Sequence, residues 1–180
     1  MTSPIYLALV LHNHQPVGQF DFVNEHAVRV AYEPLLDLLE RHPSVACAIH
    51  FTGSLLDYLV AQQRPLLERV RALVARGQLE VLSGGYYEPL LTTLPDADKI
   101  GQIHKLSAAV EDVFGMRPRG MWLAERVWEP HLVRAIAEAG IEYVIIDDTH
   151  FEAVGYDRER ELFGYFVSEE QGYTVRVFPT

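Results

Sequence analysis

The sequence has little of several features that mark particular classes of protein. It holds a single cysteine among 180 residues, so the chain cannot form an internal disulfide, and nothing points to an oxidising compartment. With 15 basic and 25 acidic residues, its net charge is −10. Because no run of Lys or Arg offers the basic stripe that displaces counterions from phosphates, we expect no nucleic-acid partner.

Long apolar runs and a leader segment are also lacking. No apolar stretch approaches the roughly 18 residues needed to span a bilayer. The N-terminal Met-Thr-Ser-Pro has neither the basic region nor the cleavage site of a secretory signal. We therefore expect a cytoplasmic protein that does not bind membranes. Apolar residues make up 49% and charged residues 22%, which is typical of a globular domain, and Cys47 should pack as a small hydrophobic side chain.

Short apolar runs alternate with helical patterns along the chain. The runs predict strands over 5–11, 45–51, 79–82, 120–123, 141–146 and 173–178. Apolar residues at helical spacing predict helices over 27–39, 65–74, 95–114 and 130–138. Such alternation implies right-handed parallel crossovers, and hence an α/β fold in which parallel strands alternate with helices in a sheet or barrel.

The last expected strand is followed directly by the end of the sequence, with no helix to cover it. A closed eight-fold barrel usually takes about 250 residues. We therefore expect residues 1–180 to form one unit, the N-terminal part of an incomplete barrel whose C-terminal part is missing. The edge of its last strand should then be exposed.

Polar and aromatic side chains gather where the expected strands end, which is where parallel α/β folds place their active sites. Strand by strand, these residues are His12 and His14; His50; Glu80 and Glu88; Trp122, Glu125 and Trp128; and Asp147, Asp148 and His150. Any one of them alone is more often structural, such as a hydrogen-bonded loop histidine or a core tryptophan. Their joint placement at five successive strand ends predicts a functional cleft.

The residue types of this cleft suit a neutral, polyhydroxylated ligand. Carboxylates and imidazoles can bind sugar hydroxyls, flat aromatic side chains can stack on sugar rings, and no Gly-rich phosphate loop is present. Glycoside transfer also needs two carboxyl groups beside the scissile bond. The adjacent Gly84 and Gly85 would allow the backbone to approach the site closely.

Three short motifs, His14–Pro16, Gly77–Glu80 and Trp122–Trp128, occur in this order. They resemble the first three motifs of glycoside hydrolase family 57, which contains α-amylases, amylopullulanases, branching enzymes and 4-α-glucanotransferases. The flanking residues are most similar to the 4-α-glucanotransferase and α-amylase group. The resemblance extends from about residue 5 to residue 179, which is nearly the whole chain.

The resemblance implies a retaining enzyme on an incomplete (β/α)7 barrel, with α-1,4-glucans or maltooligosaccharides as substrates. Glu125 falls on the family's catalytic nucleophile, which attacks the anomeric carbon and forms a covalent glycosyl-enzyme. The positions that match the family's donor-sugar subsite are His12, His14, Glu80 and Trp122. The resemblance implies no metal and no organic cofactor for this chemistry.

The family's acid/base is an Asp in a motif that lies beyond residue 180 in full-length members. Asp147 and Asp148 match an earlier strand end of the family and not that motif. Without a proton donor, cleavage of an ordinary glycosidic bond should lose about 10²–10⁴-fold in rate. We therefore expect little or no turnover from the 180-residue chain alone.

Two other interpretations compete with this one. A metal-dependent hydrolase such as a polysaccharide deacetylase would recruit ligands from the set Asp147, Asp148, His150, His12 and His14, although the sequence has no His-x-x-x-His pair to complete the site. A non-catalytic half-barrel would bind glucan, or assemble with a second chain that supplies the missing Asp. The sequence leaves open the oligomeric state and the choice between transferase and hydrolase.

Overall fold

The computed structural model describes residues 6–180. Its strands are β1 (Val10–Asn13), β2 (Cys47–Phe51), β3 (Leu79–Leu82), β4 (Gly120–Trp122), β5 (Tyr143–Ile146), β6 (Phe166–Glu170) and β7 (Tyr173–Pro179). Its α-helices are α1 (Asp21–Ala27), α2 (Glu33–Arg41), α3 (Gly53–Gln62), α4 (Arg64–Ala75), α5 (Asp96–Phe114), α6 (Leu132–Glu138) and α7 (Thr149–Glu152). Short π- and 3-10-helical turns cover Val28–Tyr32, Leu91–Thr93 and Ala124–Arg126.

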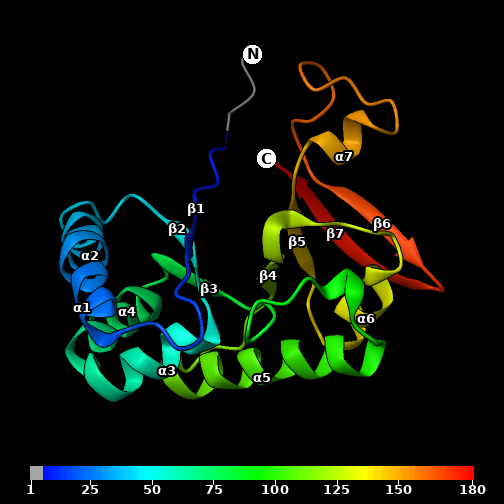
Figure 1. Ribbon diagram of the computed structural model, residues 1–180. Coiled ribbons are helices and arrows are strands. Elements are labelled where there is room, and N and C mark those ends of the chain that lie inside the picture. The colour runs from blue at the N-terminus through cyan, green and yellow to red at the C-terminus, as the bar shows by residue number, and fades with distance from the viewer. Residues whose placement is uncertain (1–5) are drawn as a thin grey trace, which may run out of the picture.

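The strands form two sheets that stand side by side (Figure 1). The first sheet has the order β1-β2-β3 and is parallel. The second has the order β4-β5-β7-β6, in which only the β6–β7 pair is antiparallel. A single bridge joins them: Ser83 donates its N–H to the Gly120 carbonyl at 2.9 Å and accepts from the Trp122 N–H at 2.8 Å. The α/β alternation is confirmed, and within residues 6–180 the strands do not close into a barrel.

The helices bury one face of each sheet in two hydrophobic cores. The core of the first sheet includes Ile49, Val81, Leu59 and Val70. The core of the second sheet includes Met121, Val144, Val177 and Ile136. The long helix α5 runs beneath both sheets (Figure 1), with Val110 in the first core and Ile103 in the second. The opposite face carries His12, His50 and Glu80 on the first sheet, and Trp122, Tyr143 and Ile145 on the second.

β1 begins later than the apolar pattern predicts. Val10 pairs with Ala48, which is only the second residue of β2, so residues 6–8 extend beyond the start of their neighbour. Ile5, the first residue of the expected strand, lies outside the described residues. Because of this shift, His12 lies within the strand and not after it.

The expectation that the last strand has an exposed edge is wrong. β6 and β7 form a hairpin whose turn residues, Gln171 and Gly172, have φ angles of 53° and 84°. Two successive positive φ angles are typical of the type I′ turn that joins twisted antiparallel strands. As a result β7 lies between β5 and β6 and has a neighbour on both edges.

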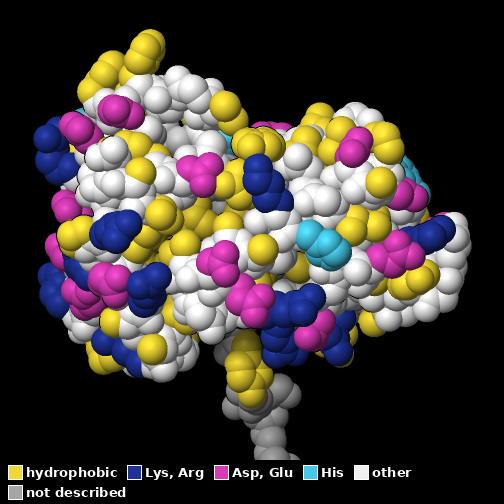
Figure 2. All heavy atoms as spheres, turned by 90° about the horizontal axis from the view of Figure 1, so that it is seen from below, with side chains coloured by type: hydrophobic (Ala, Val, Ile, Leu, Met, Phe, Trp, Pro, Cys, Tyr) yellow, Lys and Arg dark blue, Asp and Glu magenta, His cyan; other side chains and the backbone are white. Residues whose placement is uncertain are grey.

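The surface carries both signs of charge. Lys and Arg side chains are interspersed with Asp and Glu on the face that contains α5 (Figure 2). Cys47 is buried against the first core, as its apolar surroundings predict, and burial raises the pKa of its thiol. None of the helices within residues 6–180 is long and apolar enough to cross a membrane.

Gln78 ties β3 to the segment that joins α2 to β2. Its side chain is buried, and its Nε2 lies within hydrogen-bond distance of the carbonyls of Leu39, His42 and Val45 (2.8, 3.0 and 2.8 Å). Arg76 donates from Nε to its Oε1 at 2.7 Å. The amide thereby adds hydrogen bonds to the carbonyls of Leu39 and His42, which also accept from backbone N–H groups, and binds the Val45 carbonyl.

We expect Gln78→Ala to lower the free energy of unfolding by about 1–3 kcal/mol, because the hydrogen bonds of a buried amide to the segment between α2 and β2 are lost. Gln62→Ala, at the exposed end of α3, is the matched control and should change it by less than about 0.5 kcal/mol. Urea unfolding at neutral pH measures both, and equal effects of the two substitutions would contradict this role of Gln78.

Candidate functional site

His12 and His50 meet because β1 and β2 are parallel neighbours. The register pairs the two residues, so their side chains lie on the same face of the sheet. Their Nδ1 atoms are 2.9 Å apart. Asn13 adds a second tie by donating from Nδ2 to the His50 carbonyl at 3.2 Å. The carboxyl ends of these strands therefore present two imidazoles in direct contact.

The loop that follows β3 passes tightly over His50. A Cβ on Gly84 would lie 2.7 Å from Nε2 of His50, so no larger residue fits there without displacing a neighbour. The Tyr86 hydroxyl donates to Asp57 of α3 at 2.6 Å. A Cβ on Gly53 would lie 2.4 Å from the Tyr86 ring, so this aromatic side chain also needs a glycine beside it. These close contacts hold the loop against α3.

α5 holds the same loop from another side. The Lys105 ammonium lies 4.0 Å from the ring centre of Tyr86 and 4.4 Å from that of Tyr87, and it donates to the Tyr87 hydroxyl at 2.6 Å. The next residue, Glu88, has a φ of 54°, a left-handed conformation that non-glycine residues seldom adopt. Because such strain persists only where the surroundings impose it, the anchored tyrosines account for the position of Glu88.

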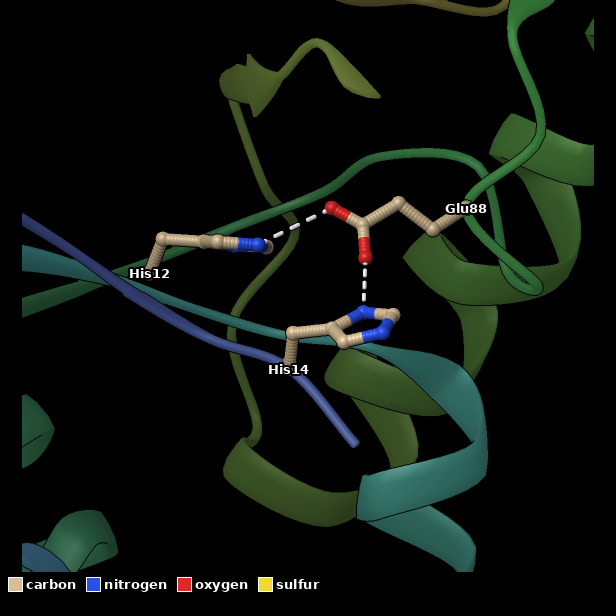
Figure 3. Close-up of side chains that lie close together, drawn as sticks. All are labelled: His12, His14 and Glu88. Atoms are coloured by element: carbon tan, nitrogen blue, oxygen red, sulfur yellow. Dashed lines mark hydrogen bonds and ion pairs between the residues drawn. The ribbon is translucent and has the colours of Figure 1, made fainter. Parts of the chain in front are cut away.

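Glu88 bridges His12 and His14 (Figure 3). Its Oε1 lies 3.0 Å from Nε2 of His12, and its Oε2 contacts Nδ1 of His14. The Glu88 side chain is only 10% exposed, and this burial by itself raises the pKa of the carboxyl group. The hydrogen bond from His12 and the electrostatic contributions of the three neighbouring histidines outweigh it, so the pKa of Glu88 falls below its ordinary value. Glu88 is thus an ionised acceptor.

Hydrogen-bond consistency assigns the protons of this network. Because ionised Glu88 can only accept, His12 donates from Nε2 and His14 from Nδ1. When the His12 ring is neutral, its Nδ1 then accepts from Nδ1–H of His50. Nε2 of His50 carries no hydrogen in this arrangement, and it is buried without a hydrogen-bond partner in the described part of the chain. Burial, followed by the potential of His12, lowers the pKa of His50 to about 3, so His50 is neutral.

Trp122 of β4 completes the cluster. Its ring is stacked on His12, with 4.5 Å between ring centres and 10° between the ring planes. One face of the indole is therefore covered by an imidazole. The residues that the structure brings together, from the ends of four strands, are His12, His14, His50, Glu88 and Trp122.

Glu80 lies deeper than this cluster. It pairs in register with Ala48, two residues before the level of the paired histidines. Its Oε1 accepts from the Tyr143 hydroxyl at 2.8 Å, and burial together with this bond raises the pKa of Tyr143. The tyrosine lies across Gly120, where a Cβ would be 2.0 Å from its ring. Glu80 and Tyr143 line a cavity of about 440 Å³ between the two sheets.

Glu125 lies in a strained turn after β4. Glu125 and Arg126 have φ angles of 51° and 53°, and each such non-glycine residue costs about 1–3 kcal/mol. The end of β5 holds the turn: Asp147 Oδ2 lies 3.4 Å from Nη2 of Arg126, and His150 Nε2 donates to the Arg126 carbonyl at 3.1 Å. Hydrogen bonds from Thr149 lower the pKa of Asp147. The Glu125 side chain is exposed, and it has no hydrogen-bond or ion-pair partner among residues 6–180.

The remaining candidates lie apart from the histidine cluster. Asp148 is buried and pairs with Nε of Arg158 at 2.5 Å. Trp128 and His150 line a second cavity of about 440 Å³. Within the described residues, the one group of three metal-capable side chains whose ligand atoms lie within 4.8 Å of one another is His12, His14 and Glu88. That group contains none of Asp147, Asp148 and His150, which the deacetylase interpretation would recruit together with His12 and His14.

Sequence reasoning does not single out Tyr143, Arg126 or Arg158. The signal for Tyr143 is Gly120, the residue paired with it across β4 and β5. The importance of Gly120 can be recognised only when the register of β4 and β5 is known, and the sequence does not determine that register.

Known proteins resemble this chain over nearly its whole length. Residues 8–180 match the profile of glycosyl hydrolase family 57. Alpha-amylase 1 of Dictyoglomus thermophilum is 53% identical over 179 residues, which are 99% of this chain and 26% of that protein. The 4-alpha-glucanotransferase of Thermococcus kodakarensis is 43% identical over 169 residues, which are 94% of this chain and 26% of that protein.

The fold is similar as well. The crystal structure of 4-alpha-glucanotransferase from Thermococcus litoralis superposes with a TM-score of 0.92 at 41% identity, and the match covers 96% of this chain and 27% of that one. This chain thus spans about a quarter of the length of these relatives.

We expect His50 to make the protein less stable in mild acid. The ordinary pKa of 6.5 applies to the unfolded chain and about 3 to the folded one, so between these values only the unfolded state takes up the proton. The free energy of unfolding therefore falls as the pH falls through this window, by about 2 kcal/mol from His50 between pH 8 and pH 5.

Urea unfolding at several pH values measures this dependence. His50→Leu removes the titrating group and should weaken the loss of stability by about that amount, whereas His104→Leu, on the exposed side of α5, should leave it unchanged. An identical pH dependence in wild type and His50→Leu would contradict the buried, neutral state of His50.

Proposed function

Because the chain belongs to glycosyl hydrolase family 57, we propose that it forms the N-terminal part of a retaining catalytic domain that acts on α-1,4-glucans or maltooligosaccharides. The proposed activity is of the 4-α-glucanotransferase or α-amylase type, as the names of its relatives suggest. The proposed architecture is an incomplete (β/α)7 barrel. Two mainly parallel sheets that share a cavity and are joined by one bridge between β3 and β4 support it.

Glu125 is the proposed nucleophile. One observation carries this role: its carboxylate is exposed and unpaired among residues 6–180, in a strained turn that Asp147 and His150 hold through Arg126. A carboxylate in this state is free to attack the anomeric carbon and displace the leaving oxygen, which forms a covalent glycosyl-enzyme. Water or the hydroxyl of a second sugar then releases the glycosyl group.

The histidine cluster is the proposed donor-sugar subsite. In the assigned proton arrangement, both nitrogens of His12 are occupied, by His50 and by Glu88. Nε2 of His14 is a free acceptor, and Glu88 keeps further lone pairs, so the cluster suits ligands that donate O–H groups. Glu80, which lies below the histidine cluster, is proposed to belong to the same subsite. Trp122 is proposed to contact the sugar with the part of its ring that His12 does not cover.

The proposed acid/base lies outside these 180 residues, in the later family motif. The two aspartates at the end of β5 are engaged elsewhere: Asp147 with Arg126 and Thr149, and Asp148 with Arg158. An activated substrate whose leaving group needs no proton would therefore react with this chain more readily than a glucan does. For a glucan, the lack of a general acid costs about 10²–10⁴-fold.

A 5-fluoro-α-glucosyl fluoride tests the nucleophile, because fluoride leaves without protonation and the ring fluorine slows release of the trapped sugar. We expect intact-mass analysis to show one glucosyl adduct per chain, and peptide mapping to place it on Glu125. Glu125→Gln should abolish the adduct, since an amide cannot form the ester.

The matched control is Glu129→Gln, a second exposed glutamate four residues further along the chain, which should be labelled at the wild-type rate. An adduct that persists in Glu125→Gln would rule out Glu125 as the nucleophile. Saturable binding of maltoheptaose in calorimetry without any adduct would favour the non-catalytic glucan-binding interpretation.

A further inference from the structure

We propose that His12, His14 and Glu88 form a binding site for a divalent first-row transition-metal ion such as Zn²⁺. Their ligand atoms all lie within 4.8 Å of one another, and each histidine faces one oxygen of the Glu88 carboxylate (Figure 3). The metal site shares these side chains with the proposed donor-sugar subsite, but metal binding there depends on no glucan chemistry. It also leaves the glycosidic reaction free of any need for a metal.

The donor set defines the class of ion. Two imidazole nitrogens and one carboxylate oxygen suit Zn²⁺, Co²⁺, Ni²⁺ or Cu²⁺, whereas Mg²⁺ and Ca²⁺ prefer oxygen ligands throughout. Zn–N and Zn–O bonds of about 2.0–2.2 Å place tetrahedral ligand atoms roughly 3.3 Å apart. Nε2 of His12 and Oε1 of Glu88 are already 3.0 Å apart, so a small movement would admit an ion between them.

His50 supplies the outer support that a ligating histidine needs. A metal on Nε2 of His12 requires the proton of that ring on Nδ1, which faces Nδ1 of His50 at 2.9 Å. The proton of His50 then moves to its own Nε2, beside Gly84. Because that nitrogen is buried without an acceptor in the described part of the chain, this tautomer is the less favourable one. We therefore expect a site that binds metal reversibly and is not filled permanently.

The site is open on one side. The His14 side chain is 46% exposed, so a fourth coordination position faces solvent, as in metal sites that accept an exogenous ligand. The net charge of −10 of the whole chain further favours a cation. A metal here would occupy the position where the proposed donor sugar meets His14.

Calorimetric titration of the 180-residue chain with ZnCl₂, in a buffer that does not bind metals, tests the site. We expect saturable binding of one Zn²⁺ per chain, weakened at least about tenfold by His14→Gln and by Glu88→Gln. His104→Gln and Glu111→Gln, both exposed on α5, are the matched controls and should bind as wild type does. MgCl₂ and CaCl₂ should not compete. Circular dichroism and urea unfolding verify that each variant is folded.

Tryptophan fluorescence gives the location independently. The chain has two tryptophans, and only Trp122 is stacked on His12. CoCl₂ should therefore quench the Trp128→Phe variant strongly and the Trp122→Phe variant weakly, because a paramagnetic ion on His12 lies next to Trp122.

The proposal is overturned if Zn²⁺ does not bind saturably, if His14→Gln and Glu88→Gln bind as wild type does, or if Co²⁺ quenches Trp128 in preference to Trp122. The glucosyl-fluoride labelling of Glu125 is run with a chelator present, so its failure and the failure of the metal site are separate results.

Discussion

The carboxylate of Glu88, held between His12 and His14, is the contact on which the arrangement of the strand ends depends. Its charge requires both histidines to donate, and with a neutral His12 this places the proton of the buried His50 on Nδ1. Contacts of the loop that follows β3 hold the Glu88 carboxylate in this position. Gly84 lets the backbone pass over His50, and Lys105 holds the preceding tyrosines on α5.

A second constraint acts at the neighbouring strand ends. The chain turns through two left-handed residues, Glu125 and Arg126, and side chains from the end of β5 hold this turn. Backbone strain of the kind seen in this turn and at Glu88 is typical of functional sites, where the position of a side chain matters more than the stability of the fold. The two carboxylates differ in a way that fits different roles. Glu88 is largely buried and each of its oxygens contacts a histidine, whereas Glu125 is exposed and unpaired among residues 6–180.

Much of the fold could be predicted from the sequence, because strong local signals mark its elements. α5 ends at Phe114 before Gly115, whose φ of 71° is the left-handed cap that its sequence position suggests. The elements that escaped prediction lack such signals. α3 carries Leu55, Leu56 and Leu59 in the core and has a nearly continuous apolar character, so no helical period stands out. β6 depends on its pairing with β7, which local sequence does not reveal.

For the candidate site, the strand-end residues could be predicted because topology alone places them along one edge of the strands. Their partners could not. Whether Glu80 would meet a histidine or Tyr143 depends on register, on the glycine opposite Tyr143 and on side-chain rotamers. In the same way, Asp148 has a strand-end position but turns to Arg158.

A crystal structure of the chain with maltotriose tests the central claim most directly, namely that these strand ends bind the sugar of an α-glucan. The account predicts a glucose ring with hydroxyls on His14 and Glu88 and its anomeric carbon about 3–3.5 Å from a Glu125 oxygen. A sugar bound instead in the cavity lined by Trp128, with the histidine cluster left vacant, would contradict it.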